Sequence, residues 1–302
     1  MKKEDRTKGR SKPINIIRRL AYAKYLYKLG VEQSKKIYPL CCAAILPLHD
    51  SVEHFLQLAS EHLDIGRIGK GNVEFVEYWD LLSPRLSPEG LTHKEAMKRL
   101  NKARVGSKHH GINLPKEEIK AFSDTVTEFF EANTTRIFGV EFDAIAMAYL
   151  VTCAEARKNL ELAYKLLEKY KNEDALDKIA LAFGQILDEY RSRNKKSLMR
   201  AAFSELSISD NYNRGDDKLA VFVREVKASI EAIQESLEII SLGIDFRHYI
   251  KFRLLTPIVN RTVGGQYYIH RRPQKVSKKD VIFCFDFAIE SAIMLQSVDF
   301  NA

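Results

Sequence analysis

A short basic segment that ends in two histidines carries the residue types best suited to chemistry in this sequence. Arg104, Lys108, His109 and His110 fall within seven residues, and Gly111 follows them. A guanidinium presents a planar fork of donors to two phosphate oxygens, and an imidazole can move a proton near neutral pH. The segment therefore predicts a site that handles phosphate esters. The alternative is an ordinary solvated helix end whose histidines only bond the last carbonyls.

The spacing of these residues sets a geometric condition on such a site. At about 100° per residue, Arg104 and Lys108 share one face of a helix. His109 then lies about 140° from Arg104 and His110 about 120° from it, so neither histidine shares a face with the arginine. Either a bend at Gly106 or a second copy of the chain would be needed to bring a histidine to Arg104.

A polar stripe lies on another predicted helix, over residues 39–63. His49 and Glu53 are four residues apart, as are Asp50 and His54, so each carboxylate can orient an imidazole. The alternative is simple pairing on a solvated surface. His49 and His54 are five residues apart and point away from each other, so no metal site is predicted.

The net charge of +8 is regional. Residues 246–279 hold nine Lys and Arg and no Asp or Glu, and residues 1–12 carry a net +4. Residues 13–245 sum to only −1. Concentrated positive charge attracts polyanions such as RNA, and the alternative is a surface that only aids solubility.

Aromatic residues alternate with these basic ones, as in proteins that bind single-stranded nucleic acid. Aromatic faces stack on unpaired bases while Arg and Lys hold the backbone. Tyr249 and Phe252 belong to this pattern, although aromatic residues in strands are often core. The predicted RNA-binding set comprises Lys108, Arg247, Lys251, Arg253, Arg261, Tyr267, Tyr268, Arg271 and Arg272.

Helical periodicity dominates the rest of the chain and predicts a mainly α fold with a small β-hairpin in the basic segment. Thr92, with Glu95 three residues on, is a candidate N-cap. The length suggests about two domains, which we place at residues 1–140 and 141–302. Helices are expected over residues 17–37, 39–63, 72–82, 92–104, 115–139, 143–171, 173–193, 216–240 and 279–297, with a strand, turn and strand within 246–272.

The sequence favours a soluble, cytoplasmic protein with no membrane partner. The charge-free stretches 37–49 and 144–154 are shorter than the roughly 17 to 25 residues of a bilayer span. The basic N-terminus is not followed by the apolar core of a signal peptide. The four cysteines have no zinc-binding spacing. Gly66, Gly69 and Gly71 lack the ending of a phosphate-binding loop and predict a turn.

The motif resembles the signature of a known superfamily. Arg104 and His109 give Arg-x4-His, and the His110-Gly111 ending is similar to that of many HEPN proteins, which carry Arg-x4-6-His near the end of a helix in a four-helix bundle. The resemblance covers about residues 15–140. It implies a HEPN-like helical bundle that works as a homodimer, with the two motifs facing each other across a cleft.

The same resemblance implies a metal-independent endoribonuclease that needs no cofactor. The RNA 2′-hydroxyl would attack the neighbouring phosphate and leave a 2′,3′-cyclic phosphate and a 5′-hydroxyl. His109 would be the general base or acid, with His110 as its substitute, and Arg104 would stabilise charge on the phosphate. Lys108 would hold the adjacent phosphate.

The family also implies an acidic residue near the motif and a biological role. Glu53 or Asp50 matches the acidic residue that the bundle often places beside the Arg and His. A toxin or antiphage defence effector would act on host RNA and have an antitoxin or another defence-system protein as a partner.

Val105 replaces the family's usual polar residue, which favours an alternative, a non-catalytic HEPN-like module that binds nucleic acid or protein. A helical adaptor without either activity is the third hypothesis.

Overall fold

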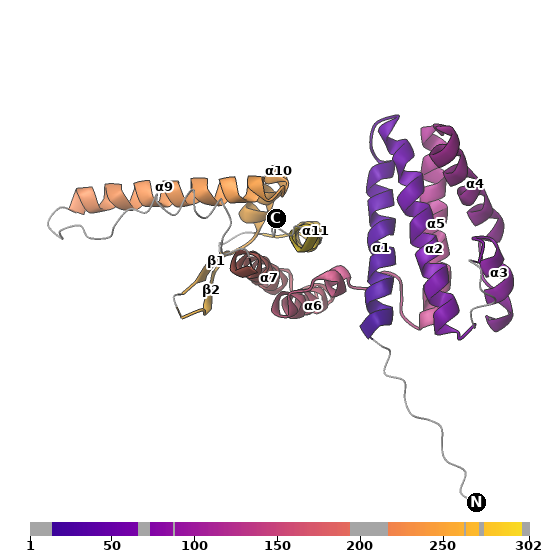
Figure 1. The fold of residues 1–302 in the computed structure, drawn as a ribbon. Coiled ribbons are helices and arrows are strands. Elements are labelled where there is room, and N and C mark those ends of the chain that lie inside the picture. Colours follow the sequence, from indigo (N-terminus) through magenta and orange to yellow (C-terminus); the bar gives the residue numbers. More distant parts are fainter. Residues whose placement is uncertain are drawn as a thin grey trace, which may run out of the picture. The chain divides into compact units, whose positions relative to one another are not determined.

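The structure is a computed structural model of the 302-residue chain, and it describes residues 14–65, 73–86, 88–193, 217–262, 264–271 and 275–297. The chain divides into two compact units, Met1–Leu150 and Val151–Ala302. The described part is mainly helical with one two-stranded antiparallel hairpin near its C-terminal end (Figure 1), which confirms the predicted fold class at this level. No described helix is long and apolar enough to cross a membrane. The predicted glycine turn at residues 66–71 lies outside the described residues.

The first unit is built from four long helices and several short ones. In chain order its elements are α1 (Ile14–Ser34), η1 (Leu40–Ala44), α2 (Ile45–His62), α3 (Glu77–Leu82), η2 (Ser83–Arg85), α4 (Lys94–His110), α5 (Lys116–Phe138) and η3 (Met147–Leu150). α2 contacts α1, α4 and α5, and the four long helices lie alongside one another in Figure 1. α2 is therefore the helix around which the first unit is assembled.

The apolar stripe of α2 explains this central place. Leu48, Val52, Phe55, Leu56 and Ala59 recur at three- and four-residue spacings and are all fully buried. Phe55 meets the rings of three α5 residues edge-on, with centroids 5.3 to 5.4 Å apart; these residues are Phe129, Phe130 and Phe138. The predicted polar stripe of α2 is divided: His49 faces Asn101 of α4, and His54 packs edge-on against Tyr22 of α1.

The entry to α4 differs from the predicted capping box. The residue before the helix is His93, with φ at 63°, and not Thr92. The Thr92 carbonyl accepts a bond from Trp79 Nε1 at 2.7 Å, and its hydroxyl accepts one from Asn133 Nδ2 at 2.8 Å. Thr92 therefore joins α3 to α5, and tertiary hydrogen bonds take the place of the local cap.

The first unit ends later than predicted because a buried lysine holds the segment after α5. The predicted helix over residues 143–171 is wrong in its first part, since α6 begins only at Ala154. The ammonium group of Lys24 on α1 donates to the backbone oxygens of Phe142 (2.9 Å), Asp143 (2.8 Å) and Ile145 (3.1 Å). These bonds hold the segment against α1 in turns, and the Phe142 oxygen also accepts one from the Ile145 amide at 3.2 Å. The first unit runs to Leu150.

The second unit contains five helices and the hairpin among its described residues. They are α6 (Ala154–Glu168), α7 (Asn172–Arg193), α9 (Asp217–Ser241), α10 (Phe246–Leu255), β1 (Ile258–Arg261), β2 (Tyr267–His270) and α11 (Lys278–Ser297). β1 pairs with β2 in register from Ile258 opposite His270 to Arg261 opposite Tyr267. The hairpin and α11 both contact α7.

The basic segment is half helix and half hairpin. Residues 246–255 form α10, although the first predicted strand begins at Phe252. The side chain of Asp245 caps this helix by accepting a bond from the His248 amide at 2.8 Å. Tyr249 and Phe252 are buried and surround the Phe183 ring, whose centroid is 4.9 Å from that of Phe252. These two aromatic residues are core, which corrects the expectation that they stack on RNA bases.

Candidate functional site

Arg104 lies on the side of α4 that faces α2, and one N–H group of its guanidinium makes no hydrogen bond to the described residues. Its Nε atom is buried and has no hydrogen-bond partner among the described residues. A buried N–H group without a partner costs free energy comparable to a lost hydrogen bond. The Nε–H is therefore a donor that an acceptor such as a phosphate oxygen could use only after the side chain or its cover moves.

Asp50 on α2 is the carboxylate whose charge acts on this arginine. The pKa of Asp50 is lowered, first by its hydrogen bond with His49 and further by the positive charge of Arg104. Its side chain is 45% exposed, so solvent weakens these interactions. Of the two acidic residues expected near the motif, Asp50 is the one whose charge interacts with that of Arg104. Glu53 lies one turn further along α2, and its Oε2 atom is 3.9 Å from Nδ1 of His49.

A buried histidine connects the two helices at this point. His49 is 2% exposed, and its Nε2 atom lies 3.0 Å from Oδ1 of Asn101 on α4. Its Nδ1 atom lies 3.4 Å from an Asp50 oxygen. The ring stacks on Phe75 with centroids 4.3 Å apart. The four-residue spacing from Glu53 marks His49 as a candidate in the sequence. Asn101 is not marked by any pattern, except that it lies one turn before Arg104.

The basic end of α4 is exposed to solvent. Lys108, His109 and His110 are exposed residues of its last turn, and no described hydrogen bond or ion pair joins either histidine to Arg104. The helix continues as regular α-helix to His110, so Gly106 does not interrupt it. Within one chain, the charge of Asp50 thus acts on Arg104, whereas no described contact joins His109 or His110 to this arginine.

Gly111 ends this helix for a backbone reason. Its φ of 62° lies in the left-handed region that glycine tolerates best, and the next amide, that of Ile112, donates to the Gly106 carbonyl at 3.2 Å. The glycine of the motif is therefore explained by helix termination. It places the two histidines on an ordered last turn and not in a loop.

Three ligand atoms near Arg104 are close enough to share a cation. One atom from each of His49, Asp50 and Glu53 lies within 4.8 Å of the other two. The imidazole and carboxylate types suit a divalent transition metal. The positive charge of Arg104 acts on Asp50, however, and opposes a second cation there. These three donors therefore suit an interaction with the positively charged arginine better than the binding of a metal ion.

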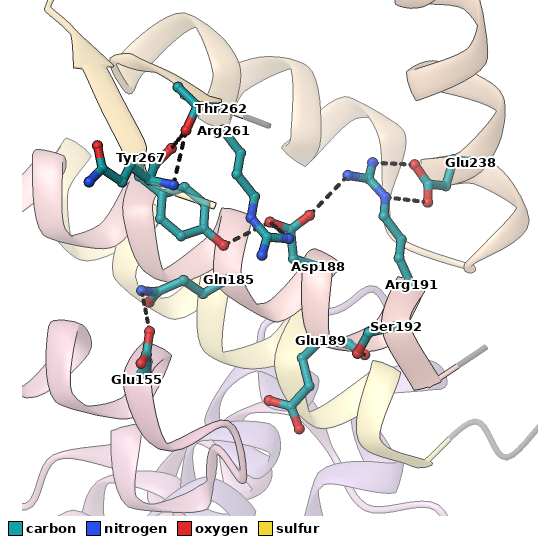
Figure 2. Close-up of polar contacts among 11 residues, drawn as sticks. Glu155, Gln185, Asp188, Glu189, Arg191, Ser192, Glu238, Arg261, Thr262 and Tyr267 are labelled. Atoms are coloured by element: carbon teal, nitrogen blue, oxygen red, sulfur yellow. Dashed lines mark hydrogen bonds and ion pairs between the residues drawn. The ribbon is translucent and has the colours of Figure 1, made fainter. Parts of the chain in front are cut away.

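Two hairpin residues of the predicted RNA-binding set, Arg261 and Tyr267, bind a carboxylate of their own unit. Figure 2 shows Asp188 of α7 beside both Arg261 and Tyr267. The Tyr267 hydroxyl donates to Asp188 at 2.7 Å, and Arg261 lies 3.3 Å from the same oxygen. Burial and this carboxylate raise the pKa of Tyr267 well above its ordinary value, so the hydroxyl stays a donor. Nearby, Arg191 donates two bonds to Glu238 of α9.

Arg271 is held by the acidic first turns of α7. Its guanidinium donates hydrogen bonds to the carboxylates of Asp177 and Asp174, and its Nη1 atom lies 3.7 Å from Oε2 of Glu173. These hydrogen bonds raise the pKa of Arg271 above its ordinary value. The guanidinium is thus surrounded by carboxylates that would repel a phosphate.

The remaining members of the set differ in exposure. Arg253 lies 3.5 Å from Glu235, and the Lys251 ammonium lies 4.1 Å from the centre of the Phe283 ring. Arg247 and Tyr268 are exposed, and Arg272 lies outside the described residues. Of the set in this unit, Arg247, Lys251 and Tyr268 are therefore the described residues best placed to meet a ligand.

Comparison with known proteins adds no relative to this picture. No family model, no curated protein and no solved structure matches the chain. The functional argument therefore depends on the residues and their geometry.

Proposed function

We propose that this protein is an endoribonuclease of HEPN type that acts as a homodimer. The observation that carries the proposal is the state of Arg104: its Nε–H is buried without a partner, beside Asp50 and on the same helix as Lys108, His109 and His110. The Nε–H of this arginine is thus a donor with no partner among the described residues, and the side chain would have to turn toward solvent to offer it to a phosphate oxygen. The helix bundle around α2 and the Arg-x4-His spacing support the same assignment.

The proposed reaction is an attack by the RNA 2′-hydroxyl on the adjacent phosphorus. His109 takes the proton from the 2′-hydroxyl or delivers one to the departing 5′-oxygen, and Arg104 stabilises the charge that develops on the phosphoryl oxygens. The bond to the 5′-oxygen breaks as the bond to the 2′-oxygen forms. The products are a 2′,3′-cyclic phosphate and a 5′-hydroxyl, and water is not consumed in this step.

The regular course of α4 is the reason for proposing a dimer. Arg104 and His109 lie about 140° apart around an uninterrupted helix, so one chain does not direct both groups at one phosphate. In a symmetric dimer the motif of one protomer faces that of its partner, and the histidine of one chain completes the site of the other. The proposed biological role is that of a toxin or antiphage defence effector held in check by a partner protein.

The test compares cleavage of a mixed-sequence RNA by the wild-type protein and by His109→Ala, His110→Ala and Arg104→Ala. Arg99→Ala, an exposed arginine on the same helix, is the matched control. Loss of cleavage in His109→Ala and Arg104→Ala, with cyclic phosphate ends and no cleavage of 2′-O-methyl RNA, is expected. Equal cleavage by Arg104→Ala and Arg99→Ala would overturn the assignment.

A second candidate function is a HEPN-like module that binds RNA or protein without cleaving. Val105 favours it, because this apolar side chain is 39% exposed beside Arg104, where a polar residue is usual in the family. Such a module would show salt-sensitive RNA binding that depends on Arg104, and intact RNA at every enzyme concentration.

A further inference from the structure

We propose that α9 is a self-association helix, whose exposed apolar seam pairs with the same seam of a second copy of the chain. The inference goes beyond the proposed function, because this seam lies in the second unit and takes no part in the phosphate chemistry. It consists of six apolar residues at alternating spacings of three and four. They are Val223, Val226, Ile230, Ile233, Leu237 and Ile240, and together they are the α9 seam.

The spacing of the α9 seam differs from that of a helix packed in a globular core. A core helix carries a wider stripe that includes adjacent apolar residues, such as Phe55 and Leu56 on α2. Alternating spacings of three and four give a period of about 3.5 residues, which is that of a coiled coil. A straight helix drifts from this period by about 20° per heptad, so the seam stays in line only when helices wind around each other. The pattern therefore predicts another helix as the partner.

The second unit holds α9 by one face of its C-terminal half. Glu238 accepts two bonds from Arg191 of α7 (Figure 2), and Oε2 of Glu235 lies 3.5 Å from Nη2 of Arg253 on α10. Ile239, next to Glu238, is fully buried. These three α9 residues define the face that packs within the unit.

The α9 seam lies on the other side of the helix. At about 100° per residue, Ile233, Leu237 and Ile240 lie about 140° to 160° from Glu235. Their exposed fractions are 58%, 38% and 53%, and the three earlier members of the seam are partly exposed. A run of large apolar side chains that is left open to solvent marks an interaction surface.

The residues that flank the α9 seam favour an identical chain as the partner. In a coiled coil these positions often carry charges that select one partner and repel others. On α9 they are Phe222, Lys227, Ser229, Gln234, Ser236 and Ser241, and only Lys227 is charged. Two identical seams can therefore meet without rows of like charges. Because the seam is apolar along its length, it also complements its own copy, as a two-fold symmetric contact requires.

The test measures the association of the full chain by sedimentation equilibrium. Ile233→Asp and Leu237→Asp should each raise the dissociation constant by about 100-fold or more, because an unpaired charge is costly in an apolar contact. Ile233→Leu keeps an apolar side chain and should stay within about 5-fold of the wild type. The matched control is Val221→Asp, since Val221 is 46% exposed and lies about 40° from Glu235, away from the seam.

Circular dichroism checks that each variant keeps its helix content. The control should associate like the wild type. Equal dissociation constants for Ile233→Asp and Val221→Asp would overturn the proposal. So would a wild-type chain that is monomeric at every concentration.

A second readout locates the contact on α9. Hydrogen exchange over residues 223–240 should slow as the protein concentration rises in the wild type and in Val221→Asp, but not in Ile233→Asp. Slow exchange in a monomeric chain would show that another segment of the same chain covers the seam, and the proposal would be wrong. A dimer whose α9 exchange ignores concentration is held elsewhere, which sinks this proposal and leaves the proposed function standing. Association through α9 in a protein that leaves RNA intact would have the reverse meaning.

Discussion

Arg104 in the first unit and Arg271 in the second carry the same side chain in opposite surroundings. Arg271 is surrounded by three carboxylates of α7, whereas Arg104 has one half-exposed carboxylate nearby and a buried Nε–H without a partner. Arg271 belongs to the segment 246–279, which holds nine Lys and Arg and no Asp or Glu. A high local charge therefore does not identify the arginine that is available to a phosphate.

The two sets of arginines differ in what a phosphate would have to displace in order to bind. The carboxylates near Arg271, Arg261 and Arg253 neutralise these arginines within the folded unit, so a phosphate would have to displace them. A phosphate at Arg104 would instead fill an empty donor. We infer that the hairpin arginines mainly hold the hairpin to α7 and that α4 carries the anion site.

The largest expected effect separates these two arginines in RNA cleavage. Arg104→Ala should lower kcat/KM by about 100-fold or more, the usual cost of removing a group that stabilises transition-state charge. Arg271→Ala should change it by less than about 2-fold. A comparable loss in both variants, measured with the same RNA at one salt concentration, would break the comparison.

The next effect concerns stability in the second unit. Asp188→Ala leaves the Tyr267 hydroxyl and the Arg261 guanidinium without their shared acceptor, so the free energy of unfolding should fall by about 1 to 3 kcal/mol. Tyr267→Phe removes one bond and should cost about 0.5 to 1.5 kcal/mol. Urea unfolding measures both. If Asp188→Ala is as stable as the wild type, the hairpin is not held by this carboxylate.

A smaller effect tests the exposed part of the basic segment. Arg247→Ala removes an exposed charge, so RNA affinity should weaken by a few-fold at low salt, and the salt slope should decrease by about 1. The Arg261→Ala variant serves as the comparison, and its salt slope should stay unchanged. Binding curves at three salt concentrations decide between them. A larger slope change in Arg261→Ala would show that the ion pair with Asp188 opens for RNA.

The smallest effect is the acid sensitivity of the first unit. The pKa of Asp50 is lowered in the folded protein, so its contribution to stability is complete above the ordinary pKa and is lost as pH falls through the lowered value. Between about pH 5 and pH 3, the wild type should lose up to about 1 kcal/mol more than Asp50→Asn, since the group is half-exposed. Equal losses in urea unfolding at these two pH values would contradict the interaction with His49.

The sequence predicts the long helices well because their apolar stripes are long and regular. It is wrong over residues 252–255, the start of the predicted first strand, where a short apolar run suits a strand or a helix equally. These residues continue a helix that Asp245 caps. It also misses the burial of Lys24, because the three carbonyls that receive its ammonium group come from a distant loop.

The candidate site was predictable in its charged groups and not in its buried ones. Arg104 and the acidic residues of α2 stand out by type and spacing. His49 stands out only through its spacing from Glu53, and its contact with Asn101 is not predictable, because only the packing of α2 against α4 places the imidazole beside the amide. Likewise, the partners of Arg261 and Arg271 lie on α7, more than 70 positions earlier in the chain, and no local pattern reveals them.

The most direct test of the central claim follows the arginine Nε–H signals while RNA is added. A short 2′-O-methyl RNA, which cannot undergo the proposed attack, is titrated into 15N-labelled protein at low salt. The account predicts that the Arg104 signal shifts as RNA binds, while those of Arg261 and Arg271 stay in place. Shifts of Arg261 and Arg271 with an unchanged Arg104 signal would contradict it.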